Sequence, residues 1–180
     1  MKVRLLPGAL TLMGLRSVFN GSVYGGSTPP GSTTYVPHRT NNMQGKTFPG
    51  SAAGIVILNN KNEIFLMQRS EKSRNDHNMW SIPGGKVELN ESVEDAVIRE
   101  TKEEADVDVQ ELEHLGYADH ILPEYNQHWI AQIFLATKWT GEPKNMEPNN
   151  FDDVGWFSLD NIPESSDVVT RAIELLKSST

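Results

Sequence analysis

The sequence of 180 residues contains no cysteine. Disulfide bonds, thiolate nucleophiles, zinc ribbons and iron–sulfur clusters are therefore excluded. The absence fits a reducing compartment, and we expect a cytoplasmic protein. The sequence also has no apolar run that approaches the roughly 18 residues of a membrane-spanning helix. We therefore expect no membrane partner.

Acidic residues are absent from the first third of the chain, and Glu63 is the first acidic residue in the sequence. Residues 1–50 carry five basic side chains, a charge of +5, and the remaining 11 basic and 24 acidic residues give −13, for a total of −8. An acidic domain has no surface that neutralises the phosphates of DNA or RNA, so we expect no binding to a nucleic-acid polymer. It can still hold a phosphate group if metal ions lie between the carboxylates and the ligand.

Residues 1–48 differ in composition from the rest of the chain. Glycine and proline interrupt their first apolar stretch, and residues 25–34, Gly-Gly-Ser-Thr-Pro-Pro-Gly-Ser-Thr-Thr, are typical of a linker. We predict a flexible basic N-terminal arm over 1–48 and one globular domain over 49–180. Three interpretations of the arm stay open: a disordered extension, an organelle-targeting segment, or a segment that orders on a partner, including a second copy of this chain.

Strands and helices are predicted from residue 50 onward. Short apolar runs bounded by turn residues predict strands, and two amphipathic segments, 92–105 and 165–177, predict helices. Residues 83–85, Pro-Gly-Gly, predict a tight turn. This order of elements predicts a mixed α/β sandwich, an α+β arrangement with a mixed sheet. The strands are expected at residues 52–58, 63–69, 79–82, 107–120, 128–137 and 154–157.

The predicted helix over 92–105 carries a group of acidic residues. Ser92 is a suitable N-cap, and Asp95 three positions later completes a pair that resembles a capping box. Glu100, Glu103 and Glu104 stand at positions i, i+3 and i+4, which a helix brings onto one face. A divalent cation would relieve their mutual repulsion, because such cations bind carboxylate oxygens. Taken alone, this spacing favours an ordinary solvated acidic face over a metal site.

Residues 85–107 set these glutamates at fixed distances from other charged residues and from a glycine. The pattern over these 23 positions resembles the Nudix box, and residues 80–84, Trp-Ser-Ile-Pro-Gly, are similar to the run that precedes that box. Residues 141–148 are similar to those of MutT-like members that act on nucleotides. The residues that match the box are Gly85, Glu91, Arg99, Glu100, Glu103 and Glu104.

The resemblance covers roughly residues 50–177 and implies a Nudix-type α/β/α sandwich. It further implies a MutT-like nucleotide pyrophosphohydrolase. Such an enzyme cleaves a pyrophosphate bond in a nucleoside triphosphate, or in a substrate linked through a nucleoside diphosphate, by attack of water. The cofactor that it implies is Mg²⁺, or Mn²⁺ in its place. Phosphoryl transfer needs positioning and charge neutralisation more than a protein nucleophile, so the physics agrees with this expectation.

Roles for individual residues follow from the positions that match the family. Glu100 or Glu103 would act as the base that activates water. Arg99 would pair with Glu91 and steady the helix, because a guanidinium binds a carboxylate through two hydrogen bonds. The expected metal ligands are Glu100, Glu103, Glu104 and the backbone carbonyl of Gly84.

Further substrate contacts are weaker candidates. Arg69 at the end of a predicted strand could meet a phosphate, and Trp80 could stack on a base, as could Trp129, Tyr125 or Phe151. The family often takes a fourth acid from a loop outside the box, and Glu147 is preferred here over Asp152 and Asp153. Each of these residues also fits an ordinary role in packing or as a solvated charge. His120 and His128 are not expected to bind the metal, because Mg²⁺ prefers oxygen ligands.

Two positions depart from the family pattern. Thr101 occupies an aliphatic position, where its hydroxyl could bond to the preceding helical turn. Asp106 occupies the final glycine position, where helices often end in a left-handed conformation that Asp adopts at some cost. These departures leave an alternative open: a catalytically weak Nudix-fold domain that binds a nucleotide. The basic arm on an acidic domain leaves another: an assembly component that acts through its arm.

Overall fold

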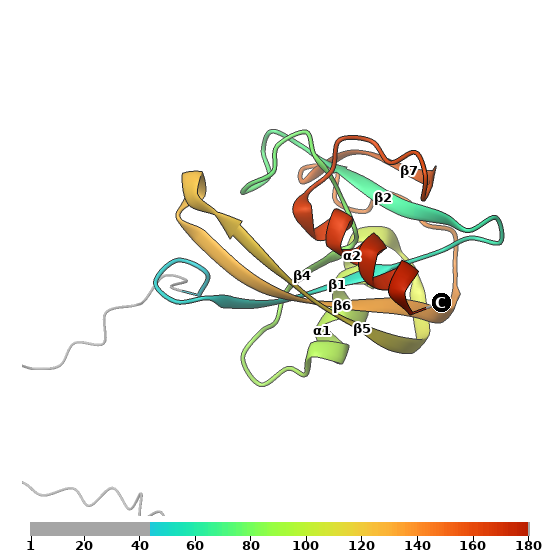
Figure 1. Cartoon of the computed structure of the whole chain (residues 1–180), viewed down its shortest axis with the longest axis horizontal. Helices are drawn as coiled ribbons and strands as arrows, with labels where there is room; N and C mark the ends of the chain where they lie inside the picture. The colour runs from blue at the N-terminus through green and yellow to red at the C-terminus, as the bar shows by residue number, and fades with distance from the viewer. Residues whose placement is uncertain (1–43, 180) are drawn as a thin grey trace, which may run out of the picture. The chain divides into compact units, whose positions relative to one another are not determined.

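The computed structural model describes residues 44–179 of the chain (Figure 1). Residues 1–43 of the predicted arm lie outside the described residues. The elements follow the order predicted from the sequence, with one additional short strand. They are β1 (Gly50–Val56), β2 (Glu63–Arg69), β3 (Trp80–Ser81), β4 (Gly84–Lys86), α1 (Val93–Ala105), β5 (Asp108–Leu122), the 3₁₀ turn η1 (Pro123–Tyr125), β6 (Gln127–Thr140), β7 (Phe151–Ser158) and α2 (Asp167–Ser178).

The described strands form two sheets, of which the larger has the order β4–β1–β6–β5 and the smaller β3–β2–β7. In the larger sheet, β1 runs parallel to β6 from the pair Gly50–Trp129 to the pair Val56–Leu135. Its other neighbours pair antiparallel, so the sheet is mixed. The smaller sheet is antiparallel throughout. The predicted α/β class with a mixed sheet is therefore confirmed.

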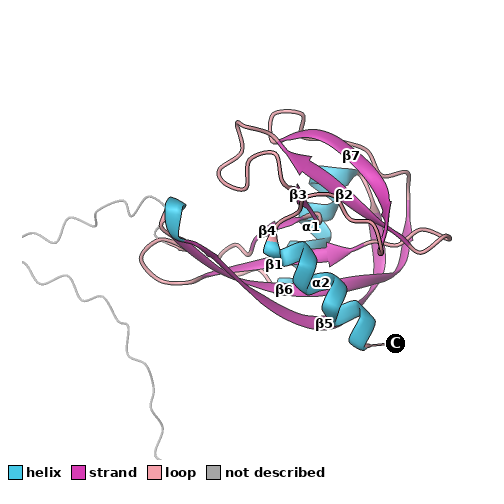
Figure 2. Cartoon of the chain, turned by 45° about the horizontal axis from the view of Figure 1, so that its top comes forward, coloured by secondary structure: helices cyan, strands magenta, loops and turns pink. Residues whose placement is uncertain are grey.

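The two helices cover opposite faces of the larger sheet, as Figure 2 shows. Neighbouring residues of a strand point to opposite faces, and in β1 the side chain of Ile55 packs with Val97 of α1, while that of Val56 packs with Val169 of α2. The apolar run of β1 is thus buried on both sides, which explains why it lacks a polar–apolar alternation. Neither helix in residues 44–179 is long and apolar enough to cross a membrane.

Strand β4 replaces the tight turn that was predicted at residues 83–85. Gly84 and Gly85 pair with Gly54 and Ala53 of β1, and the amide of Ile55 donates to the carbonyl of Pro83. A side chain at position 84 would collide with this neighbour, because a Cβ there would lie 2.2 Å from the carbonyl oxygen of Ala53. Glycine has a low intrinsic preference for strands, so the pairing offered by β1 decides the conformation here.

The β5–β6 hairpin is longer than predicted at both strands. Its pairing runs from Asp108 with Thr140 to Leu122 with Gln127. The turn η1 and Asn126, which has a φ of 50°, connect the two strands. Several outward-facing residues of the hairpin are exposed, so the apolar residues in the sequence are a poor guide to where these strands begin and end.

Both ends of α1 have the predicted caps. The hydroxyl oxygen of Ser92 accepts a hydrogen bond of 3.0 Å from the amide of Asp95. At the other end, Asp106 adopts the left-handed conformation, with φ 55° and ψ 32°, and its amide donates to the carbonyl of Lys102. Asp106 thus accepts the backbone geometry for which the family pattern has glycine.

Thr101 is fully buried in α1, and its hydroxyl donates to the carbonyl of Val97 over 2.6 Å, as predicted. That carbonyl belongs to the helical ladder, so it does not depend on the hydroxyl. We expect Thr101→Val to leave the free energy of unfolding unchanged, or to raise it by up to about 1 kcal/mol. Thr101→Ala should lower it by about 1–2 kcal/mol, because it leaves a small cavity. Urea unfolding of both variants measures this; a large loss in the valine variant would contradict the packing described here.

Candidate active site

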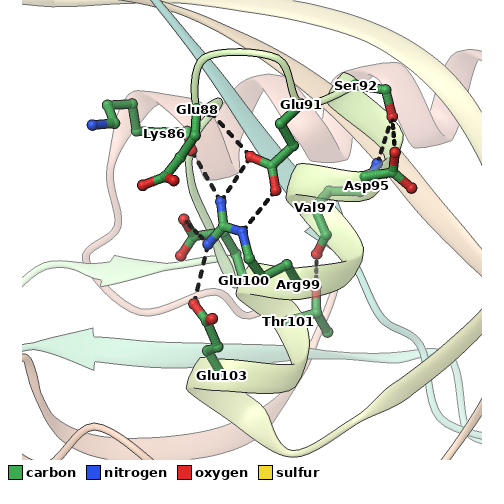
Figure 3. A network of polar contacts seen from close by, with 10 residues as sticks. All are labelled: Lys86, Glu88, Glu91, Ser92, Asp95, Val97, Arg99, Glu100, Thr101 and Glu103. Carbon is green, nitrogen blue, oxygen red and sulfur yellow. Dashed lines mark hydrogen bonds and ion pairs between the residues drawn. The ribbon is translucent and has the colours of Figure 1, made fainter.

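Arg99 and Glu91 form the predicted bidentate ion pair (Figure 3). Nε and Nη2 of Arg99 donate to the two carboxylate oxygens of Glu91 over 2.7 and 3.0 Å. The hydrogen bond from Arg99 is the main reason that the pKa of Glu91 falls to about 2. Arg99 also donates to the carbonyl of Lys86 at the end of β4 over 3.3 Å. The pair therefore fastens the middle of α1 to the loop that follows β4.

The guanidinium of Arg99 also binds two of the predicted metal ligands. Its Nη1 donates to Glu100 over 2.8 Å and to Glu103 over 3.1 Å. With Glu91, the guanidinium therefore contacts three carboxylates in all (Figure 3). The hydrogen bond with Glu91, more than any other contact, raises the pKa of Arg99 above its usual value. Arg99 thus offsets part of the repulsion along this side of α1.

Glu104 lies on the inner side of α1, away from Arg99. Its residue is 7% exposed, and its carboxylate accepts a hydrogen bond of 2.9 Å from the amide of Gly84. Burial raises the pKa of Glu104 to about 8, and the charges of Glu100 and Glu147 add to this effect. A carboxylate in this position is poorly compensated by the protein alone.

The carboxylate of Glu100 packs against the backbone of Gly85. A Cβ at position 85 would lie 2.5 to 2.6 Å from its carboxylate atoms, so a larger residue there would force this carboxylate to move. Burial raises the pKa of Glu100, although the Arg99 hydrogen bond opposes this, and Glu103 and Glu147 raise it further. Glu147, from the loop between β6 and β7, is therefore the outside acid whose charge reaches the helix.

Four carboxylates, called the acidic group here, have the donor chemistry of a divalent metal site: those of Glu100, Glu103, Glu104 and Glu147. The ligand atoms of this group are carboxylate oxygens, which Mg²⁺ and similar hard cations prefer. Burial of Glu100 and Glu104 is unfavourable while they are ionised, and a cation would remove that penalty. Among residues 44–179, no three acidic or histidine side chains already converge as a metal cage. The side chain of Arg99 and the amide of Gly84 bond to several of these oxygens instead.

An open cavity of about 190 Å³ lies beside the acidic group. Gly84, Gly85 and Lys86 of β4 line it, and the first two of these also contact Glu104 and Glu100. Strand β4 therefore borders both the cavity and the acidic group. Other lining residues that bear on the site are Arg69, Asn75, Asp76, His120, Gln127 and Trp129.

Two of the weaker substrate candidates have different positions. Arg69 lines the cavity, and its guanidinium donates to the backbone and side-chain oxygens of Asn75 over 2.9 and 3.0 Å. Burial lowers the pKa of Arg69. Trp80 does not line this cavity but packs edge-on against Phe157, with 4.7 Å between the ring centres. The aromatic side chain at the cavity is that of Trp129, which donates to Gln127 over 2.9 Å.

A cluster centred on the buried His120 was not predicted from the sequence. The residue is 9% exposed, and its ring bonds to Asp76 over 2.9 Å and to Asp167 at the start of α2. Burial alone would lower the pKa of His120, but the hydrogen bonds and charges of the two aspartates outweigh it and raise the pKa. The partners stand 44 and 47 positions away, so no local spacing could indicate them. The cluster ties the loop after β2 to the cavity wall.

The chain is similar in sequence and in fold to known proteins. The NUDIX domain family model matches residues 48–177. An 8-oxo-dGTP diphosphatase of Proteus vulgaris is 40% identical over 91 residues, which are 51% of this chain and 78% of that protein. The NAD-capped RNA hydrolase NudC of Pectobacterium carotovorum subsp. carotovorum (strain PC1) is 28% identical over 130 residues, 72% of this chain and 47% of that protein. The crystal structure of a MutT NUDIX hydrolase from Burkholderia pseudomallei is 35% identical with a TM-score of 0.66, covering 72% of this chain and 98% of that one.

The family match spans most of the chain and coincides with the sheet, the helix α1 and the acidic group. The chain therefore belongs to the NUDIX domain family, the Nudix hydrolases. This is a family of pyrophosphohydrolase-type enzymes that generally use divalent metals.

The His120 cluster predicts a pH-dependent contribution to stability. A group whose pKa is raised by folding stabilises the folded protein fully at a pH below its pKa in the unfolded chain, about 6.5 for histidine. This stabilisation is lost as the pH rises through the pKa of the group in the folded protein. We therefore expect His120→Gln to lower the free energy of unfolding more at about pH 5.5 than at about pH 9. Urea unfolding at both values measures the difference. His114→Gln is the control on the same strand, because His114 is exposed and contacts the neutral Gln132. An equal loss of stability at both pH values in His120→Gln would contradict the stabilising role of the protonated His120.

Proposed function

We propose that this protein is a Mg²⁺-dependent pyrophosphohydrolase that cleaves a nucleoside triphosphate or a nucleoside diphosphate-linked substrate. The observation that carries the proposal is the acidic group, in which Glu104 is buried and Glu100 and Glu147 are partly buried, and which shares strand β4 with a cavity that Arg69 and Lys86 line. Anionic groups that hold a cation and cationic groups that face a phosphate are the two requirements of phosphoryl transfer. Relatives named as an 8-oxo-dGTP diphosphatase and an NAD-capped RNA hydrolase support the substrate class.

The side chains divide into a metal-holding and a substrate-holding group. Bound Mg²⁺ would neutralise charge on the phosphoryl oxygens and make an attacking water more acidic. Around it, Arg99 orients the carboxylates of α1, and Glu100 or Glu103 accepts the proton of the water. At the cavity, Trp129 offers an aromatic surface to a base, and Arg69 offers a charge to a phosphate once it exchanges its bonds with Asn75. The metal would be held by Glu100, Glu103, Glu104, Glu147 and the carbonyl of Gly84.

A substrate panel tests the proposal directly. The purified chain is incubated with Mg²⁺ and, separately, with canonical nucleoside triphosphates, 8-oxo-dGTP, ADP-ribose and NAD-capped RNA. Chromatography follows the release of a nucleoside monophosphate together with pyrophosphate or a second phosphorylated product. Saturable nucleotide binding without turnover of any of these compounds would instead favour a Nudix-fold binding domain.

The acidic side chains of α1 should be essential for turnover. We expect Glu100→Gln and Glu103→Gln each to lower kcat by roughly 10²–10⁴-fold, because the amide cannot accept the proton and binds a cation weakly. Steady-state kinetics on the best substrate measures the loss. The matched control is Glu94→Gln, which alters an exposed glutamate in the first turn of the same helix and should leave kcat unchanged. Full activity without a divalent cation would refute the metal dependence.

Arg99 should act through the geometry of its bonds rather than through its charge alone. Arg99→Lys keeps the positive charge but cannot bind Glu91 bidentately while contacting Glu100 and Glu103. We expect a loss of about 10–100-fold in kcat/KM and a higher Mg²⁺ requirement, as for other residues that orient metal ligands. Titration of activity with Mg²⁺ measures both. Arg171→Lys, at an exposed pair with Glu174 on α2, is the control; equal behaviour of the two variants would count against this role.

A further inference from the structure

We infer that Asp106 and Lys144 anchor the loop over residues 141–150 on the end of α1, and so set the position of Glu147 beside Glu100 and Glu104. Asp106 is then a positioning residue for the metal site, at the position where the family pattern has glycine. The consequence for catalysis rests on the proposed function, while the anchor itself rests on contacts between described residues.

Asp106 joins the helix to the loop through its two carboxylate oxygens. Oδ1 lies 2.7 Å from the ammonium nitrogen of Lys102 in the last turn of α1, and Oδ2 lies 2.8 Å from that of Lys144 in the loop. The left-handed backbone at Asp106 reverses the chain at the helix end. A glycine at this position would adopt that backbone freely but would give Lys144 no partner.

The loop backbone adds a second connection to the same end of α1. The amide of Lys144 donates to the carbonyl of Ala105 over 3.1 Å, and that of Met146 donates to the carbonyl of Glu104 over 2.9 Å. The last carbonyls of a helix have no partner within the helix, so the loop completes this terminus. Met146 is bonded to the backbone of a predicted metal ligand, and Glu147 is the next residue along the chain.

Side-chain bonds within the loop fix Glu147 relative to this anchor. The amide of Glu147 donates to the side-chain oxygen of Asn145 over 3.0 Å, and its carboxylate accepts from Asn150 over 2.6 Å. Asn145 in turn donates to the carbonyl of Phe151 at the start of β7 over 2.7 Å. The position of Glu147 therefore depends on both ends of the loop, and the end at α1 is held by Lys144.

The Asp106–Lys144 pair is partly exposed, so it can position the loop while it contributes little to the stability of the fold. Side-chain exposures are 33% for Asp106 and 58% for Lys144, and pairs this exposed contribute little to folding. Met146, the residue before Glu147, is by contrast bonded to the backbone of the predicted metal ligand Glu104. A small displacement of the loop would therefore change the ligand set more than the stability of the fold.

The test is Mn²⁺ binding to the full chain without nucleotide, measured by isothermal titration calorimetry. We expect Asp106→Gly and Lys144→Ala each to weaken Mn²⁺ binding roughly 10-fold, with an unchanged or higher Tm for the glycine variant. Combining the two changes should weaken binding no further, because they remove the same bond. Asp106→Asn, which tolerates the left-handed backbone, should restore part of the affinity. Lys138→Ala, at the exposed pair with Glu111, is the control and should bind Mn²⁺ as the wild type does.

The decisive comparison uses Glu147→Gln as the starting protein. If Asp106 acts by positioning Glu147, Asp106→Gly has no further effect on Mn²⁺ binding once that carboxylate is absent. An equal loss in both backgrounds, unaltered affinity in Asp106→Gly, or a wild type without Mn²⁺ binding would overturn the inference. Turnover in the substrate panel is independent of this coupling. Coupling without turnover refutes the proposed function alone, and turnover without coupling refutes only the anchor.

Discussion

Repulsion among carboxylates on α1 is the constraint on which the arrangement of the site depends. Glu100, Glu103 and Glu104 lie within two turns of one helix, and burial makes the ionised forms of Glu100 and Glu104 unfavourable. Arg99 bonds to Glu100 and Glu103, while Glu104 accepts its hydrogen bond from the backbone amide of Gly84. The compensation by the protein is therefore incomplete on the inner side of the helix, which is where a cation would contribute most.

The same constraint explains the glycines of β4. A carboxylate can approach the strand only where no side chain intervenes, and Gly85 leaves that room for Glu100. Gly84 supplies the amide that bonds to Glu104, and it fits against β1 because it has no Cβ. The short strand β4 thus contacts the acidic group and also lines the cavity.

Local spacing predicted the parts of this site that lie within α1 or one loop away from it. The Ser92 cap and the hydroxyl bond of Thr101 join residues four or fewer positions apart, and the resemblance to the family supplied the Arg99–Glu91 pair, eight positions apart. The class of the fold followed in the same way from the order of apolar runs. Strand β4 and the His120 cluster were missed, because each depends on a partner brought close by the sheet. For the same reason, sequence could not favour Trp129 over Trp80 as the aromatic residue at the cavity.

The two departures from the family pattern are accommodated by their surroundings. Thr101 satisfies its hydroxyl on the preceding turn inside a fully buried position, so the helix keeps its packing. Asp106 keeps the left-handed turn and adds contacts to Lys102 and Lys144 that glycine cannot make. Neither change displaces a carboxylate from the acidic group, and the second connects the helix to the loop that carries Glu147. A departure from a pattern therefore has to be judged by the bonds around it, and here those bonds satisfy the polar atoms of both side chains.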